Sequence, residues 1–217
     1  MSNKTAVVIG ASGLVGRELL KQLSVNDDYS AIKTFTRSPL PENLICDKIQ
    51  QHVVDFVEMA DWSSKIIGEQ VFCCIGTTLK QAGSKERQYV IDVDYPSQFL
   101  SYAKDNGCKA AAVISSIGAG SPKSSFYLGL KAKLERSCVN NGFEHLVVVR
   151  PSVLVGERQE FRLGEEIGIV ALRALAWLPG IKKYRPIDAA QVAKAMLHFI
   201  NQPSQEQYIF ENLELFI

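Results

Sequence analysis

VVIGASGLVGRELL, residues 7–20, joins an apolar run to three glycines spaced three apart and then to a helical pattern. The glycines are Gly10, Gly13 and Gly16. Glycines between a buried strand and a helix let a pyrophosphate approach the backbone N–H groups at the helix N-terminus. The spacing differs from the standard G-x-G-x-x-G, and a plain tight turn is the alternative interpretation. The strand before, the helix after and a second strand beyond favour a dinucleotide site.

Short β-branched runs alternate with helical patterns along the chain, which is typical of βαβ units. Several runs lack polar alternation, as expected of strands covered on both faces. The sequence therefore predicts an α/β fold, namely a Rossmann-like, doubly wound, mostly parallel sheet with helices on both faces. The predicted strands are 5–10, 31–37, 49–56, 70–76, 109–116, 145–151 and 207–211. The predicted helices are 13–25, 95–107 and 126–142.

The totals describe an ordinary globular protein. Of the 217 residues, 47% are hydrophobic and 22% are charged, and the formal net charge is +1. This balance gives no basic excess for nucleic acid, and the most apolar later segment, 167–180, is too short to span a membrane. We expect one domain over 1–217, in which 152–186 and the C-terminal segment form a cap on the substrate side.

The cysteines and histidines indicate neither a disulfide framework nor a metal site. The five cysteines are odd in number and contain no CxxC pair. The three histidines match no metal-ligand spacing, so we expect no bound metal. Free thiols indicate a reducing compartment, and the N-terminal apolar run is too short for a signal peptide. We therefore predict a cytoplasmic location, and leave a homodimer open.

The residues after the second predicted strand bear on the choice of cofactor. An enzyme that binds NAD usually has an acidic residue there, which accepts a hydrogen bond from the ribose 2′-hydroxyl. This chain has Thr36, Arg37 and Ser38 instead. A guanidinium pairs with a 2′-phosphate. We therefore predict NADP(H) in preference to NAD(H), the alternative being an arginine that is simply exposed at a strand end.

Two further strand ends carry candidate residues. Asp55 follows the third predicted strand, where it either accepts a hydrogen bond from the adenine amino group or caps its own loop. Ile75 and Gly76 lie at the end of the fourth predicted strand and are expected beside the cofactor ribose. A glycine at a strand exit is equally typical of an ordinary turn.

Tyr127 and Lys131 are the candidate catalytic pair. They are four residues apart on a predicted helix and therefore share a face. An ammonium near a phenol favours the phenolate and lowers the pKa of the phenol from about 10. The tyrosine could then exchange a proton with a carbonyl or hydroxyl oxygen. Ser115 or Ser116, at the exit of the fifth strand, could bind the same oxygen. Strand alternation sends their side chains to opposite faces, so only one of them can point into the site, and we favour Ser115.

Several motifs together resemble the atypical short-chain dehydrogenases/reductases. They are GASGLVG (10–16), VISS (113–116), the Tyr127-x-x-x-Lys131 pair, RPSVLVGER (150–158) and RPIDAAQVAKAM (185–196). The chain is most similar to the branch that includes the HIV Tat-interacting protein and its bacterial relatives. One departure is Cys74-Ile75-Gly76-Thr77, where many catalytic members have an Asn-Ala-Gly-like turn.

The resemblance implies a Rossmann fold, NADP(H) binding and a tyrosine acid/base. In the catalytic group that it implies, Tyr127 is the acid/base, Lys131 also holds the nicotinamide ribose, and Ser115 or Ser116 binds the substrate oxygen. It also implies cofactor contacts from Ser12, Gly13, Leu14, Val15, Arg37, Ser38, Ile75, Gly76, Val153, Leu154 and Arg158. Gly10, Gly16 and Asp55 are the further cofactor-site candidates, taken from the glycine turn and from the end of the third strand.

The leading hypothesis is an NADP(H)-dependent oxidoreductase that acts on a small carbonyl or alcohol substrate. The alternative is a non-catalytic NADP(H)-binding redox sensor that regulates a partner protein. Sugar-nucleotide epimerisation is a third hypothesis, but it needs a larger C-terminal domain than the stretch after Pro151 provides.

Overall fold

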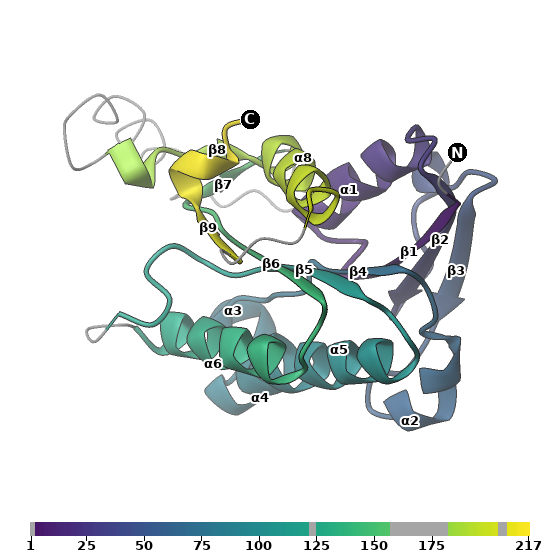
Figure 1. Ribbon diagram of the computed structural model, residues 1–217. Coiled ribbons are helices and arrows are strands. Elements are labelled where there is room, and N and C mark those ends of the chain that lie inside the picture. Colours follow the sequence, from purple (N-terminus) through teal and green to yellow (C-terminus); the bar gives the residue numbers. More distant parts are fainter. Residues whose placement is uncertain (1–2, 122–124, 157–181, 204–207) are drawn as a thin grey trace.

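A parallel sheet lies between two layers of helices (Figure 1) in the computed structural model, which describes residues 3–121, 125–156, 182–203 and 208–217. The described strands are β1 (Lys4–Ile9), β2 (Tyr29–Thr36), β3 (Ile49–Val53), β4 (Gln70–Cys73), β5 (Ala110–Ile114), β6 (His145–Arg150), β7 (Leu154–Val155), β8 (Ile187–Asp188) and β9 (Ile209–Glu211). The described helices are α1 (Leu14–Ser24), α2 (Met59–Trp62), α3 (Leu79–Ala82), α4 (Lys85–Tyr89), α5 (Tyr95–Asp105), α6 (Phe126–Asn140) and α8 (Ala189–Ile200). A π-helical turn over Val90–Asp94 joins α4 to α5.

The main sheet confirms the predicted fold class. In the described chain it has seven strands in the order β3-β2-β1-β4-β5-β6-β9, and every neighbouring pair is parallel. These are the seven strands that the sequence predicts. The direction of strand succession reverses between β1 and β4, and in open α/β sheets ligands bind outside the carboxyl ends of the strands at such a point.

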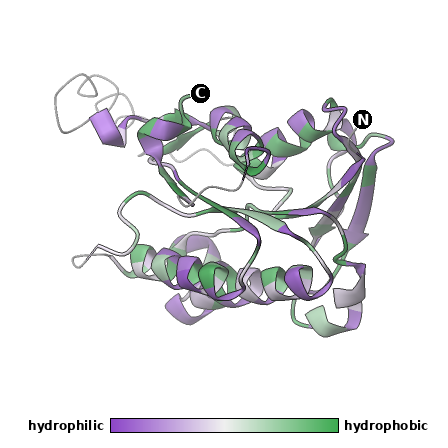
Figure 2. Ribbon diagram, viewed as in Figure 1, coloured by the Kyte–Doolittle hydropathy of each residue, from purple (hydrophilic) through white to green (hydrophobic). Residues whose placement is uncertain are grey.

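The core forms two apolar layers, one on each face of the sheet. Along β1, Ala6 and Val8 belong to the layer under α1 and α8, whereas Val7 and Ile9 belong to the layer over α5 and α6. Successive side chains of a strand point to opposite faces, so a strand covered on both sides has to be apolar throughout. Edge strand β3 is more hydrophilic than the central strands (Figure 2).

The predicted cap is described only at its two ends, because 157–181 lie outside the described residues. Buried Asn212 joins those ends to the C-terminal turn. Its side chain accepts from the N–H of Ser152 and donates to the carbonyl oxygens of Lys183 and Arg185. A two-stranded parallel sheet, β7–β8, also forms here, and two-residue strands are too short to show a sequence pattern. The cap itself stays a prediction.

Candidate functional site

The predicted site residues gather at the carboxyl edge of the main sheet. Gly10 follows β1, Arg37 follows β2, Ile75 lies two residues after β4, and Ser115 follows β5. Since the strands are all parallel, these exits lie along one edge. The edge includes the reversal between β1 and β4, where a ligand is expected.

The glycine turn packs directly against the exit of β4. Gly10 has φ +81°, and a Cβ built on it would lie 2.5 Å from the backbone carbon of Cys74. A Cβ on Gly16 would lie 2.2 Å from the carbonyl oxygen of Gly10. The turn is closed by the N–H of Gly13, which donates to that same oxygen at 3.0 Å. Side chains at 10 and 16 would therefore force the strand and the helix apart.

The N-terminus of α1 is open to an anion. Its N-cap residue, Gly13, has no side chain to bind the first N–H groups, and its first turn contains no acidic residue. Ser12 and Gly13 are exposed, Leu14 is half-buried and the Val15 side chain lies in the core. The groups available to bind an anion are therefore backbone amides with partial positive charge, which suit a diphosphate.

Arg17 is a residue of this turn that the sequence reasoning missed. Its Nε donates to the carbonyl oxygen of Ser12 at 2.9 Å, so a guanidinium lies against the glycine turn. A basic residue immediately after the third glycine was the available signal.

The residues predicted to bind the adenosine half are exposed at two strand exits. Arg37 and Ser38 directly follow β2, and Arg37 makes no ion pair with any other described residue. Asp55 is also exposed. Its Oδ1 accepts from the N–H of Val57 at 2.9 Å, which is the loop-capping contact that was one of the two interpretations. The adenine contact stays a prediction.

Tyr127 and Lys131 lie on one face of α6, as predicted. The helix is N-capped by Ser125, whose hydroxyl accepts from the N–H of Leu128 at 3.4 Å. Tyr127 is 38% exposed, whereas Lys131 is 2% exposed. The Lys131 ammonium lies 5.8 Å from the centre of the Tyr127 ring and donates to the carbonyl oxygen of Ile114 at 3.4 Å. The accessible phenol of Tyr127 therefore lies near the buried ammonium of Lys131.

The two candidate serines have different surroundings. Ser115 is buried and its hydroxyl donates to the carboxylate of Glu135, one turn beyond Lys131 on α6. Ser116 is half-buried. Strand alternation does direct Ser115 to the α6 side, since Ala111 and Val113 lie in the same layer. The hydroxyl there is already engaged, however, which leaves that of Ser116 as the freer of the two.

Behind Ser115 lies an ion network that the sequence reasoning missed. Arg150, the last residue of β6, donates to both carboxylate oxygens of Glu135 at 2.8 and 2.6 Å, and to Glu211 at 2.9 Å. These hydrogen bonds, first of all those to Glu135, raise the pKa of Arg150 above its usual range. The bidentate pair joins α6 to β6, and Glu211 extends it to β9. A glutamate four residues after Lys131 was the only local signal.

Asp92 is a second buried charge that was missed. It lies in the π-helical turn with no exposed surface, and its Oδ1 accepts from the N–H of Thr77 at 2.7 Å. Burial raises the pKa of Asp92, against the opposing effects of the Lys131 charge and of hydrogen bonds from Thr77 and Gln88. Burial also raises the pKa of the neighbouring Cys73 thiol to about 11, so this thiol is neutral and a poor nucleophile near neutral pH.

The remaining predicted residues lie at the start of the cap or outside the described chain. Ile75 packs against the apolar layer of α5 and α6, and Leu154, in β7, packs against that of α1 and α8. Val153 is exposed. Arg158 lies outside the described residues. Within the described ranges, no group of three or more potential metal ligands is present, and no helix is long and apolar enough to cross a membrane.

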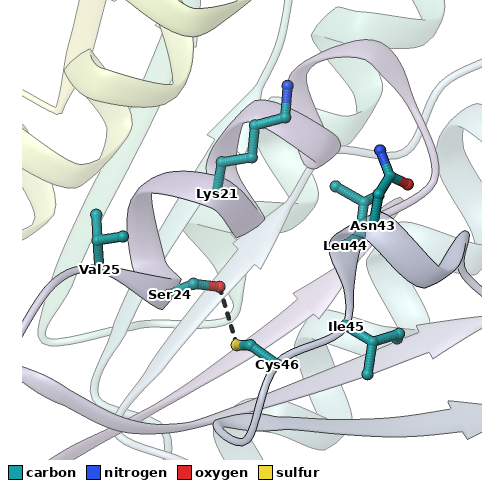
Figure 3. A pocket seen from close by; sticks show the side chains of 7 residues that line it. All are labelled: Lys21, Ser24, Val25, Asn43, Leu44, Ile45 and Cys46. Atoms are coloured by element: carbon teal, nitrogen blue, oxygen red, sulfur yellow. Dashed lines mark hydrogen bonds between the residues drawn. The ribbon is translucent and has the colours of Figure 1, made fainter.

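A cavity of about 270 Å³ lies at the opposite end of α1 from the glycine turn (Figure 3). Its lining residues come from the last turns of α1 and from 43–46, and the Cys46 thiol lies 3.3 Å from the hydroxyl of Ser24. None of the predicted site residues lines it, so it is separate from the carboxyl edge of the sheet.

Solved structures place this fold in a class. A UDP-glucose 4-epimerase from Thermotoga maritima superposes with a TM-score of 0.72 at 15% identity, covering 95% of this chain and 76% of the epimerase. A short-chain dehydrogenase/reductase superfamily protein from Agrobacterium tumefaciens, with bound NAD, has a TM-score of 0.68 at 14% identity, covering 92% and 74%. At such identities the likeness concerns the fold, which is the Rossmann fold of the short-chain dehydrogenases/reductases.

Sequence relatives define the family within that class. Protein HTATIP2 of Rattus norvegicus is 33% identical over 211 residues, covering 95% of this chain and 85% of that protein. Mitochondrial protein FMP52 of Candida albicans is 32% identical over 200 residues, covering 88% and 86%. The chain therefore belongs to the family of HTATIP2 and FMP52, atypical short-chain dehydrogenases/reductases, which confirms the resemblance given by the motifs. No family model matches the chain.

One prediction is corrected by these relatives. The yeast proteins FMP52 are named as mitochondrial, which contradicts the cytoplasmic location expected from the sequence. The cysteine content was the wrong basis for that prediction, because unpaired thiols report the redox state of a compartment and not its identity.

Proposed function

We propose that this protein is an NADP(H)-dependent oxidoreductase that acts on a small carbonyl or alcohol substrate. One observation carries the proposal. The accessible phenol of Tyr127 and the buried ammonium of Lys131 share a helix face at the same sheet edge as the open N-terminus of α1. A diphosphate site and an acid/base pair on one edge are the two parts that hydride transfer to a carbonyl requires.

The residues at this edge fit a nicotinamide dinucleotide. The amides of residues 12–15 would hold the pyrophosphate, with the guanidinium of Arg17 adding positive charge. Arg37, exposed and without an ion pair to described residues, would bind the 2′-phosphate of the adenosine half. The space beside Gly76, next to Lys131, would take the nicotinamide ribose.

The bound cofactor supplies or accepts the hydride. Tyr127 gives a proton to the carbonyl oxygen during reduction, or takes one from the hydroxyl during oxidation. The Lys131 ammonium, 5.8 Å from the centre of the Tyr127 ring, places positive charge beside the phenol. Ser116 orients the substrate oxygen, whereas Ser115, whose hydroxyl donates to Glu135, holds the exit of β5 against α6.

The test of this mechanism is Tyr127→Phe, compared with Tyr208→Phe, which removes a hydroxyl of similar exposure elsewhere. Loss of the acid/base group is expected to lower kcat about 10²–10⁴-fold and to leave the dissociation constant for NADPH nearly unchanged. Turnover is measured as NADPH oxidation across a panel of small aldehydes and ketones. An enzyme whose kcat survives Tyr127→Phe would contradict the mechanism. Stoichiometric NADPH binding without turnover by the wild type would instead favour the redox-sensor alternative.

The preference for NADP(H) is tested by Arg37→Ser. Removal of a charge-assisted bond to the 2′-phosphate is expected to weaken NADPH binding about tenfold or more and to leave NADH binding unchanged. Arg136→Ser, an exposed arginine in the C-terminal half of α6, is the matched control. If the wild type bound NADH as tightly as NADPH, the role given to Arg37 would be wrong.

A further inference from the structure

Two buried side chains of opposite charge converge on the space beside Gly76. A Cβ built on Gly76 would lie 3.5 Å from Nζ of Lys131 and 3.8 Å from Oδ1 of Asp92. Lys131 reaches this point from α6, and Asp92 reaches it from the π-helical turn. Both distances are ordinary van der Waals contacts, so a side chain at position 76 would touch both charged groups, and its absence leaves that space open.

Neither charge is fully satisfied within the described chain. Lys131 and Asp92 are 2% and 0% exposed, yet no direct ion pair joins them. An ammonium carries three donors, and the hydrogen bond recorded for Lys131, to the oxygen of Ile114, is long at 3.4 Å. The carboxylate of Asp92 is fixed by Thr77 at 2.7 Å and, more weakly, by Gln88 at 3.4 Å.

A hydroxyl group suits this space, because it can accept a hydrogen bond from the ammonium and donate one to the carboxylate. We propose that Asp92 is the positioning residue for Lys131, holding its ammonium toward the space beside Gly76, where a hydroxyl of the nicotinamide ribose binds. This inference rests on the proposed function and adds a residue to it. A water molecule that fills the same space is the other source of a hydroxyl, and the experiment separates the two.

The surroundings leave Lys131 as the cation that balances Asp92. From β4, the Cys73 thiol lies near both groups and is neutral, since burial raises its pKa to about 11. From α4, Gln88 contributes an uncharged amide. Lys133, also on α6, interacts with the exposed Asp94 and with the ring of Tyr89. Protonation of Asp92 therefore removes the negative charge that faces Lys131.

The experiment measures dissociation constants of the full chain for two ligands from alkaline to mildly acidic pH. NADPH carries the nicotinamide ribose, whereas adenosine 2′,5′-bisphosphate carries only the adenosine half. Asp92→Asn is expected to weaken NADPH binding about tenfold above neutral pH and to leave the bisphosphate unaffected. The difference from wild type should close as the pH falls and Asp92 takes up a proton. Asp94→Asn, in the same turn but exposed, should match the wild type.

Gly76→Ala provides a second variant that the surrounding protein atoms tolerate. The added methyl group would lie 3.5 Å from Nζ and 3.8 Å from Oδ1, in the space that we assign to the ribose hydroxyl, so NADPH binding should again weaken about tenfold while the bisphosphate binds as before. Equal losses for both ligands, or unchanged NADPH binding in either variant, would overturn the role of Asp92. Unchanged NADPH binding in Gly76→Ala alone would also mean that no ribose hydroxyl enters the space. A wild type that bound neither ligand would overturn the proposed function instead.

Discussion

The glycine turn over 10–16 and the charged cluster of Asp92, Lys131, Glu135 and Arg150 lie at the same sheet edge but are built in opposite ways. The turn is made of backbone from one continuous stretch, and its shape requires glycine, without a side chain, at positions 10 and 16. The cluster is made of side chains from a π-helical turn, α6 and β6, and depends on charges that are present. The turn is therefore sensitive to added atoms and the cluster to removed charges.

The two regions also differ in how much they lower the stability of the folded protein. Backbone amides at a helix N-terminus stay near solvent, so leaving them for a ligand costs little. Buried ions lose their hydration and regain it only through well-placed partners. Arg150 and Glu135 form a direct ion pair, whereas Lys131 and Asp92 form none among the described residues. We therefore expect the three changes below to act with different sizes and signs.

The largest effect is expected for Glu135→Ala. The change leaves Arg150 with Glu211 as its remaining carboxylate partner and removes the acceptor of the Ser115 hydroxyl. Breaking a buried pair from one side costs about 3–5 kcal/mol, and we expect about 3 kcal/mol here because Glu211 remains. Urea unfolding followed by circular dichroism measures the loss.

The control is Glu18→Ala, which breaks the exposed pair with Lys21 on α1. This pair should contribute less than about 0.5 kcal/mol. Equal losses in the two variants would mean that the charged cluster is no more important to the fold than a surface ion pair.

The next largest effect is expected for Gly16→Ala. The new Cβ would meet the carbonyl oxygen of Gly10, a backbone atom that can move only with the turn. Overpacking of this kind costs about 1–3 kcal/mol, although alanine is the better helix former by about 1 kcal/mol. The displaced turn should also lose most of its affinity for NADPH, measured by titration.

Gly129→Ala on α6 is the matched control, since a Cβ there meets nothing within 4 Å. It should stabilise the protein by about 0.5–1 kcal/mol and leave NADPH binding unchanged. If Gly16→Ala behaved in the same way, the close approach of α1 to β1 would not be what defines the turn.

The same contrast explains what the sequence could predict. The seven strands and the turn follow local patterns, namely apolar runs and spaced glycines, and all of these strands are present. The pairing of Glu135 with Arg150 depends on α6 lying over β6, and no local pattern contains that information. Alternation predicts that Ser115 and Ser116 point to opposite faces, but it could not reveal the carboxylate that the Ser115 hydroxyl meets on the α6 side. The π-helical turn that buries Asp92 has no sequence signature comparable to a glycine triplet.

The smallest effect on stability, and the one with the opposite sign, is expected for Asp92→Asn. Burial raises the pKa of Asp92 in the folded protein above that of the unfolded chain, so ionisation opposes folding. Removing the ionisable group should stabilise the protein near neutral pH, by less than Glu135→Ala destabilises it. The gain should shrink as the pH falls through the folded pKa and be absent below the unfolded value of about 3.9. Urea midpoints of wild type and variant across this range measure it.

Stability and NADPH binding should thus move in opposite directions in Asp92→Asn. A residue kept only for the fold would lose both on substitution, whereas a charge kept for the site destabilises the fold that carries it. Asp94→Asn provides the reference: desolvation also raises the pKa of Asp94, but this side chain is exposed, so its substitution should change the pH dependence of stability less than Asp92→Asn does. A variant at 92 that lost stability at neutral pH would place Asp92 with Glu135 as a structural ion, and the contrast between the two regions would then lie only in how they are built.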